Sequence, residues 1–192
     1  AAAIAAGVTA DVAAINAATT ITANTNATFA EAATMSGIAK AIIYSISDAQ
    51  ANIPGSTTAA LNEAVNITIT DDVNFAQAKI VDDGSNSGSN TYNINDTAAN
   101  LAAGTVTSVN AINGAGTVTS SSNAIATEAS KMAGISQAIV YSISDTAANI
   151  VANIGGLNES VNITSTDSCT FAQGKVIEDA TNSGTITYNI SD

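Results

Sequence analysis

The chain has 192 residues, of which 16 are acidic and only 4 are basic, and its formal net charge is −12. A chain so acidic is not expected to bind nucleic acid, because binding needs cationic side chains that replace the counterions on phosphate. Histidine is absent and Cys169 is the single cysteine, which excludes imidazole-based catalytic triads, histidine metal sites and intrachain disulfides.

All four tyrosines belong to one repeated five-residue motif, Tyr-Ser/Asn-Ile-Ser/Asn-Asp. The motif begins at Tyr44, Tyr92, Tyr141 and Tyr188 and ends at Asp48, Asp96, Asp145 and Asp192. It divides the chain into four repeat units: 1–48, 49–96, 97–145 and 146–192. Units one and three resemble each other, as do units two and four, so a super-repeat of 1–96 and 97–192 is superimposed on the shorter period.

Each unit is expected to contain two strand–helix modules of about 24 residues. In chain order, alternating apolar and polar residues predict strands at 42–46, 65–70, 92–96, 139–143, 161–166 and 186–190. Ala-rich stretches after these strands predict short helices, and a longer helix is expected at 125–138. Asn-Ser-Gly predicts turns at 86–88 and 182–184. In the Tyr strands, one face carries residues such as Ile42, Tyr44 and Ile46, and this face is expected to be buried.

The acidic residues that end the strands are candidate helix caps. Asp48, Asp96 and Asp145 precede Ala-rich segments and are expected to be the N-caps of the helices that follow them. Asp71 and Asp167 are expected to cap the segments that begin near Phe75 and Phe171.

A single strand with one short helix cannot bury its apolar face alone, whereas stacked modules cover one another. We therefore expect an α/β solenoid in which the tyrosines and the motif aspartates form ladders, each repeating at every second coil. A β-solenoid with little helix is the alternative, because Thr, Asn and Ser favour strands and turns.

The string Ile143-Ser-Asp-Thr-Ala-Ala-Asn-Ile150, the strand Val161-Asn-Ile-Thr and the segment Phe171-Ala-Gln resemble tandem repeats of very large secreted bacterial surface proteins. These include repeats of cyanobacteria and of calcium-binding RTX-type adhesins. The resemblance implies an extracellular stalk, coat or fibre. The Gly-Gly-x-Gly-x-Asp sequence that marks calcium-binding RTX coils does not occur in this chain.

Acidic pairs are the candidate metal ligands, because Ca²⁺ prefers carboxylate oxygens. The candidate calcium residues are Asp71, Asp72, Asp82, Asp83, Asp167, Glu178 and Asp179. The alternative interpretation is solvated loop charge that keeps the protein soluble. No other cofactor is expected. Because the acidic residues recur with the repeat instead of converging at one place, the chain is not expected to be an enzyme.

The expected function is structural: an extracellular filament, sheath or surface layer built by end-to-end and lateral stacking of solenoids. The expected partner is the protein itself, with cell-surface glycans as a further candidate, and no stretch of about 18 apolar residues predicts membrane insertion. Both ends of the sequence fall at nearly the same phase of the repeat, which suggests a longer array. The alternatives are the stalk of a calcium-dependent adhesin and, from recurring Thr-x-Thr pairs such as Thr68/Thr70, an ice-binding solenoid.

Overall fold

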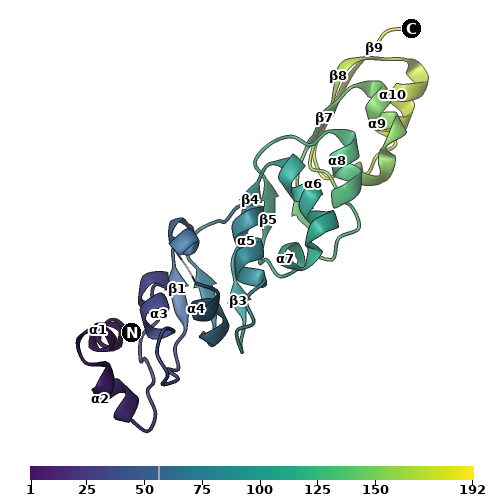
Figure 1. Ribbon diagram of the computed structural model, residues 1–192. Helices are drawn as coiled ribbons and strands as arrows, with labels where there is room; N and C mark the ends of the chain where they lie inside the picture. The colour runs from purple at the N-terminus through teal and green to yellow at the C-terminus, as the bar shows by residue number, and fades with distance from the viewer. Residues whose placement is uncertain (56) are drawn as a thin grey trace. The chain divides into compact units, whose positions relative to one another are not determined.

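A computed structural model describes residues 1–55 and 57–192 of the chain. The chain forms two compact units, Ala1–Asn93 and Ile94–Asp192. Each unit is built from short helices and short parallel strands (Figure 1). The α/β class is therefore confirmed, and the alternative with little helix is wrong. The division into four shorter repeat units stays a prediction.

The first unit contains one three-stranded parallel sheet with the order β1-β2-β3. Two isolated parallel bridges, Thr22 with Ile43 and Ala27 with Ile46, extend the strand pairing toward the first helices. Its elements are α1 (Ala2–Ala10), α2 (Val12–Ala17), α3 (Phe29–Met35), β1 (Ile46–Asp48), the 3-10 helix η1 (Gln50–Gly55), α4 (Thr58–Glu63), β2 (Ile67–Ile69), α5 (Phe75–Asp82) and β3 (Asn90–Thr91).

The second unit contains two three-stranded parallel sheets, with the orders β4-β5-β6 and β7-β8-β9. No sheet among the described residues is closed. Its elements are β4 (Ile94–Asp96), α6 (Ala98–Thr107), α7 (Val109–Asn113), β5 (Val118–Ser120), α8 (Ala126–Met132), β6 (Ile139–Val140), β7 (Ile143–Asp145), α9 (Ala147–Ala152), the 3-10 helix η2 (Ile154–Gly156), β8 (Ile163–Cys169), α10 (Phe171–Glu178) and β9 (Ile186–Ile190).

The strand register repeats at a nearly constant interval within each unit. Ile46 pairs with Ile67, Ile94 with Val118, and Ile143 with Ile163. Parallel neighbours require a crossover connection, and here each crossover between paired strands contains at least one helix. The separation of paired residues is therefore close to the predicted module length of about 24 residues.

The predicted apolar face is buried around Tyr44 and Tyr141, but at the last motif Ile186 and Tyr188 are partly exposed and Ile190 is exposed. Ile42, Tyr44 and Ile46 are buried in the first unit, and Ile139, Tyr141 and Ile143 are buried in the second. Burial of one large apolar side chain contributes about 1.5–3 kcal/mol to the stability of the fold. These faces therefore supply much of the stability of the core. The remaining core is rich in alanine.

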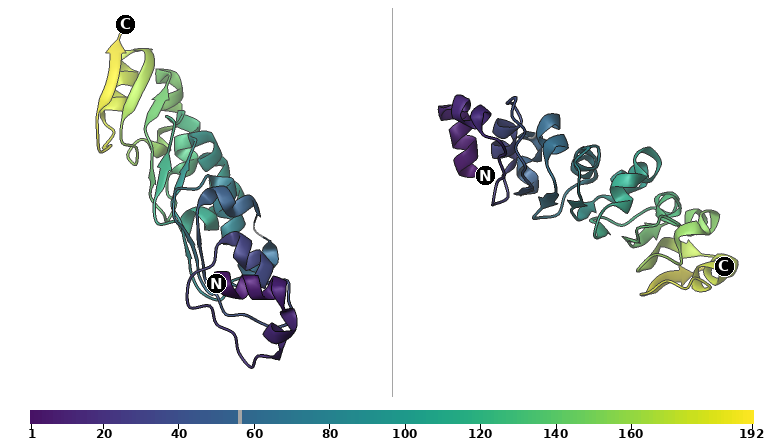
Figure 2. Two further views of the ribbon diagram at one scale, coloured as in Figure 1. Left: turned by 90° about the vertical axis from the view of Figure 1, so that its left-hand side faces the viewer. Right: turned by 90° about the horizontal axis from the view of Figure 1, so that it is seen from below.

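In the second unit, helices cover one side of the sheets. Figure 1 shows α8, α9 and α10 beside the strands β7 and β8, and in Figure 2 the yellow strand β9 lies at the outer edge of its sheet. The side chains that face away from the helices are polar: Ser144, Thr164 and Thr187 occupy paired positions on three neighbouring strands.

The helices begin at side-chain caps that the sequence encodes locally. Thr28 with Glu31, Asn74 with Gln77, and Thr170 with Gln173 form capping boxes. Thr97 and Thr146 cap α6 and α9.

The prediction of a longer helix at 125–138 is wrong, because α8 ends at Met132. Gly134 has φ of +75°, a left-handed conformation that stops a helix. Among the described residues, no helix has both the length and the apolar character needed to span a bilayer.

Candidate functional site: helix clips and sheet edges

The recurring aspartates bind the first amide of a helix that lies about 20 residues earlier in the chain. Asp48 Oδ2 accepts a hydrogen bond from the Phe29 amide at 2.9 Å, and Asp145 Oδ2 accepts one from the Ala126 amide at 3.0 Å. We call such a bond a helix clip: a side-chain oxygen that accepts the N–H group at the start of a helix that begins about 20 residues earlier in the chain. Each clip ties the end of one strand to the neighbouring helix of the same unit.

Helix clips recur in both units, with acceptors of two kinds. The carboxylate clips pair Asp48 with Phe29, Asp71 with Gln50, Asp145 with Ala126, Asp167 with Ala147 and Asp192 with Phe171. Two further clips have a hydroxyl acceptor, one in each compact unit: Thr25 accepts from the Ala1 amino group, and Ser122 accepts from the Ala98 amide. The free N–H groups of a first helical turn favour an oxygen acceptor, and a negative charge most of all.

These bonds correct the predicted capping roles. Asp145 does not cap α9, because the N-cap is Thr146, and the carboxylate instead accepts the Thr146 amide and the Asn149 side chain. Asp71 and Asp167 do not cap the helices at Phe75 and Phe171, whose caps are Asn74 and Thr170. Sequence adjacency suggested the helix that follows, whereas the parallel strand register brings each acid to the start of a helix about 20 residues earlier.

The clips lower the pKa of the two motif aspartates Asp48 and Asp145. Burial acts to raise the pKa of Asp48, but hydrogen bonds from Phe29, Asn52 and Ala49 outweigh it and lower the pKa from its ordinary value of 3.8. The pKa of Asp145 is lowered in the same way: bonds from Asn149, Ala126 and Thr146 outweigh the effect of burial.

The motif tyrosines are also tied to backbone carbonyl groups. The Tyr44 hydroxyl donates to the Ala60 carbonyl at 2.9 Å, and the Tyr141 hydroxyl donates to the Gly156 carbonyl at 2.8 Å. Burial, followed by the negative charge of Glu159, raises the pKa of Tyr141 to about 12. The two tyrosine hydroxyl groups therefore hold the chain segments that contain Ala60 and Gly156 in place.

The predicted calcium residues are distributed along the chain with separate partners. Asp83 and Asp179 pair with Lys79 and Lys175 one helical turn away, and Asp71 and Asp167 form helix clips. Glu178 accepts a hydrogen bond from the Tyr188 hydroxyl.

The two remaining calcium candidates are Asp72, which is exposed, and Asp82. Burial and then the charge of Asp83 raise the pKa of Asp82. In the described part of the chain, no three acidic, histidine or cysteine side chains gather in a metal-binding group. Calcium binding stays a prediction.

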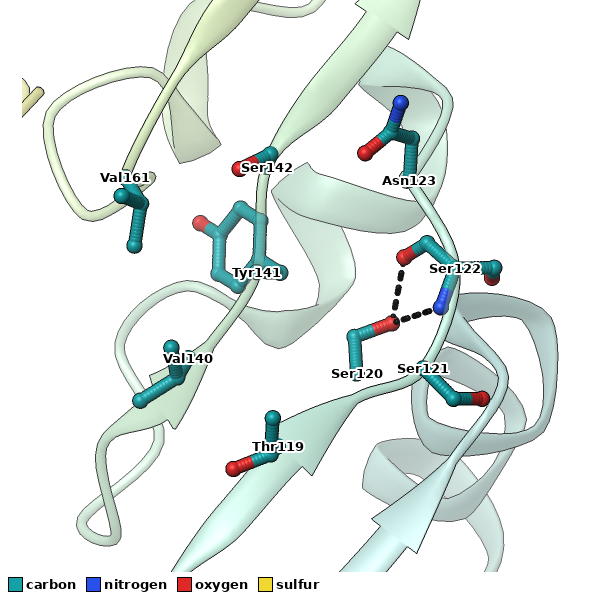
Figure 3. A pocket seen from close by; sticks show the side chains of 9 residues that line it. All are labelled: Thr119, Ser120, Ser121, Ser122, Asn123, Val140, Tyr141, Ser142 and Val161. Carbon is teal, nitrogen blue, oxygen red and sulfur yellow. Dashed lines mark hydrogen bonds between the residues drawn. The ribbon is translucent and has the colours of Figure 1, made fainter.

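A shallow groove of about 500 Å³ lies on the polar side of the second unit. Figure 3 shows Ser120, whose hydroxyl donates to the Ser122 carbonyl and accepts from its amide, beside Thr119 and Ser142. No charged side chain lines this groove among the described residues, so it offers hydroxyl groups but no electrostatic anchor.

Each of the three sheets ends in an edge strand on either side, and β9 is one of these edge strands. Its Ile190 side chain is 52% exposed, whereas the equivalent Ile94 of β4 is 1% exposed beneath β5. Residues 21–23 correspond to β5, yet they pair on one side only, through Thr22 and Ile43. Exposed edges of this kind favour pairing with another strand.

No protein-family model, curated protein or solved structure matches the chain.

Proposed function

We propose that this protein is a structural repeat protein of the cell exterior, an α/β solenoid that assembles into a filament, sheath or surface layer. The observation that carries the proposal is the use of the acidic residues. Five aspartates each accept the backbone amide at the start of an earlier helix, so that they hold neighbouring strand–helix steps together. Residues that recur with the period and bind their own backbone are the signature of a scaffold.

The strand register supports the same proposal. In all three sheets the paired residues come from successive strand–helix steps of similar length, and each step covers the apolar face of its neighbour. Stability then arises from contacts between nearest neighbours, which is how repeat architectures fold. The last strand of a stack leaves its outer backbone N–H and C=O groups unpaired. These groups can pair with a strand of another copy, which would allow such a protein to assemble.

The proposal is tested with the purified chain by analytical ultracentrifugation and negative-stain electron microscopy across protein concentrations. We expect fibres or sheets of regular width that appear above a threshold concentration. A chain that stays monomeric and folded at every concentration would contradict the assembly function and favour the adhesin stalk.

The same samples test the calcium hypothesis. Assembly is compared in Ca²⁺, in Mg²⁺ and in a calcium chelator. If fibres dissolve in the chelator and return with Ca²⁺ but not with Mg²⁺, acidic pairs act as calcium ligands in the assembled state. If chelation changes nothing, the carboxylates function as helix clips and surface charge alone.

A further inference from the structure

In the second unit, the side of the sheets that faces away from the helices carries uncharged side chains. Residues on this side alternate with the buried residues of their strands, and the strand register brings them together across neighbouring strands. We call this surface the outer sheet face; it consists of Asn95, Thr119, Val140, Ser142, Ser144 and Thr164. Among the described residues of this unit, the charged side chains lie on α8 and α10, in turns, at strand ends or in helix clips such as that of Asp145.

Val140 is the apolar member of the outer sheet face, and it is 51% exposed. Its exposure does not come from a missing neighbour, because the chain pairs on both sides of it. Thr119 of β5 lies opposite Val140 on one side. On the other side, the Val161 amide donates to the Tyr141 carbonyl at 2.7 Å. Val140 therefore projects from the middle of a paired surface.

The first unit repeats this arrangement at Ile43. Ile43 is 53% exposed and forms a parallel bridge with Thr22. On its other side, the Val65 amide donates to the Tyr44 carbonyl at 2.7 Å. A single exposed apolar residue is ordinary on a protein surface. The same β-branched projection in the same pairing context, once in each unit, is instead a feature of the repeat.

The groove of about 500 Å³ lies directly beside Val140. Figure 3 shows Val140 and Val161 on one side of this groove and Ser120 and Ser122 on the other. The outer sheet face thus combines a projecting apolar side chain with an adjacent hollow, and two such faces can interdigitate.

From these observations we propose that the outer sheet face binds the same face of a second copy of the chain, with Val140 of each copy seated in the groove of the other. This inference rests on the proposed assembly function and specifies its lateral contact. The same patch is used on both copies, so the contact is isologous and joins copies side by side in pairs.

The occupant is a second copy because of the charge of the chain. Two copies with a formal net charge of −12 repel each other wherever carboxylates meet. The outer sheet face contains none, and its hydroxyl and amide groups both donate and accept hydrogen bonds, so the face is complementary to itself. A basic partner would need carboxylates on this face, and a phosphate-bearing partner would need cations.

Two opposite charges at position 140 test the contact. In a face-to-face pair each copy presents the same residue, so Val140→Glu and Val140→Lys both bring like charges together. The side chain is half exposed, so circular dichroism is expected to show an unchanged fold. We expect each variant to raise the assembly threshold in analytical ultracentrifugation roughly tenfold or more. A lower threshold for Val140→Lys would place an acidic surface opposite Val140 and overturn the proposal.

The matched controls are Val106→Glu and Val106→Lys. Val106 lies on α6 and is 75% exposed, so these variants make the same change of charge outside the outer sheet face. They are expected to leave the threshold unchanged.

Crosslinking tests the contact without added charge. Packed sheets lie about 10 Å apart, a gap that a short bismaleimide spans and a disulfide does not. Val140→Cys treated with this reagent is expected to give a covalent dimer on denaturing gels. Val106→Cys is the control and is expected to give at least roughly tenfold less dimer. The native Cys169 is buried in both variants, and the unsubstituted chain measures its background.

The outcomes separate this contact from the proposed function. Fibres or sheets whose threshold ignores both charges, with no dimer crosslinked through position 140, would overturn the contact while the assembly function stands. Dimers crosslinked through position 140 in a chain that forms no fibre or sheet would support the contact and contradict the assembly function. Retention on chitin or cellulose that Val140→Glu abolishes, without a crosslinked dimer, would assign the face to a glycan and overturn the proposal.

Discussion

Removing a buried helix clip is expected to destabilise the second unit far more than removing an exposed carboxylate. Asp145 is 9% exposed and accepts bonds from the Ala126 amide at 3.0 Å, the Thr146 amide at 2.8 Å and the Asn149 side chain at 2.7 Å. In Asp145→Ala the Thr146 and Asn149 donors can reach water, so each of them costs only about 0.5–1 kcal/mol. Ala126 is fully buried, and its unpaired amide adds about 1–3 kcal/mol.

The expected total is about 2–4 kcal/mol of unfolding free energy, since losses at neighbouring groups do not simply add. Urea unfolding followed by far-ultraviolet circular dichroism measures it as a lower midpoint for the second unit. The control is Asp179→Ala, which removes a carboxylate whose side chain is 64% exposed and paired with Lys175 at i,i+4. That variant is expected to lose no more than about 0.5 kcal/mol. Equal midpoints for the two variants would refute the view that helix clips hold the steps together.

The pH dependence of Asp145 follows from its lowered pKa. The unfolded chain binds the proton more tightly than the folded chain, so the clip contributes its full stability above the ordinary pKa of 3.8 and loses it as the pH falls through the lower folded value. Asp145→Asn cannot titrate. The difference in unfolding free energy between wild type and Asp145→Asn is therefore expected to shrink as the pH is lowered below about 4. A constant difference would show that the charge of Asp145 contributes nothing.

Three further predictions concern packing. Phe29→Ala is expected to cost about 3–5 kcal/mol because Phe29 is 1% exposed, whereas the same change at the largely exposed Phe171 is expected to cost under about 1 kcal/mol; urea midpoints compare the two. Tyr141→Phe leaves the Gly156 carbonyl without its donor and is expected to cost about 1–2 kcal/mol in a urea unfolding experiment. Gly184→Ala puts a methyl group 2.5–2.6 Å from two oxygen atoms and is expected to lower the thermal midpoint, at a cost of about 1–3 kcal/mol.

The sequence was most informative where a short-range pattern determines the structure. Alternation of apolar and polar residues correctly predicted the buried face of the strands at Tyr44 and Tyr141, because a strand places every second side chain on one side. The spacing of the motifs predicted the α/β class and an interval close to that of the paired strands. These features depend on periodicity, which a single sequence displays directly.

The sequence was least informative about the partners of the acidic residues. Asp71 and Asp167 were expected to serve the helices that follow them or to bind calcium, but they accept amides from Gln50 and Ala147. Those pairs lie about 20 residues apart and become visible only when the strand register is known. A signal did exist: an oxygen-bearing side chain recurs near the ends of β2, β5 and β8, as Asp71, Ser122 and Asp167.

The helix clips also compensate the charge of five of the 16 carboxylates in a chain with so few cations. The 4 lysines cannot neutralise 16 carboxylates, and a long protein of this composition would repel itself if the acids were merely solvated. A carboxylate at a helix N-terminus is instead stabilised by backbone amides and by the helix dipole. Because repeated steps supply one such N-terminus each, the number of carboxylates that can be held grows with the number of steps. A repeat protein of the proposed kind would therefore keep a negative surface charge, which opposes non-specific association. Its backbone amides would compensate the carboxylates that hold neighbouring steps together.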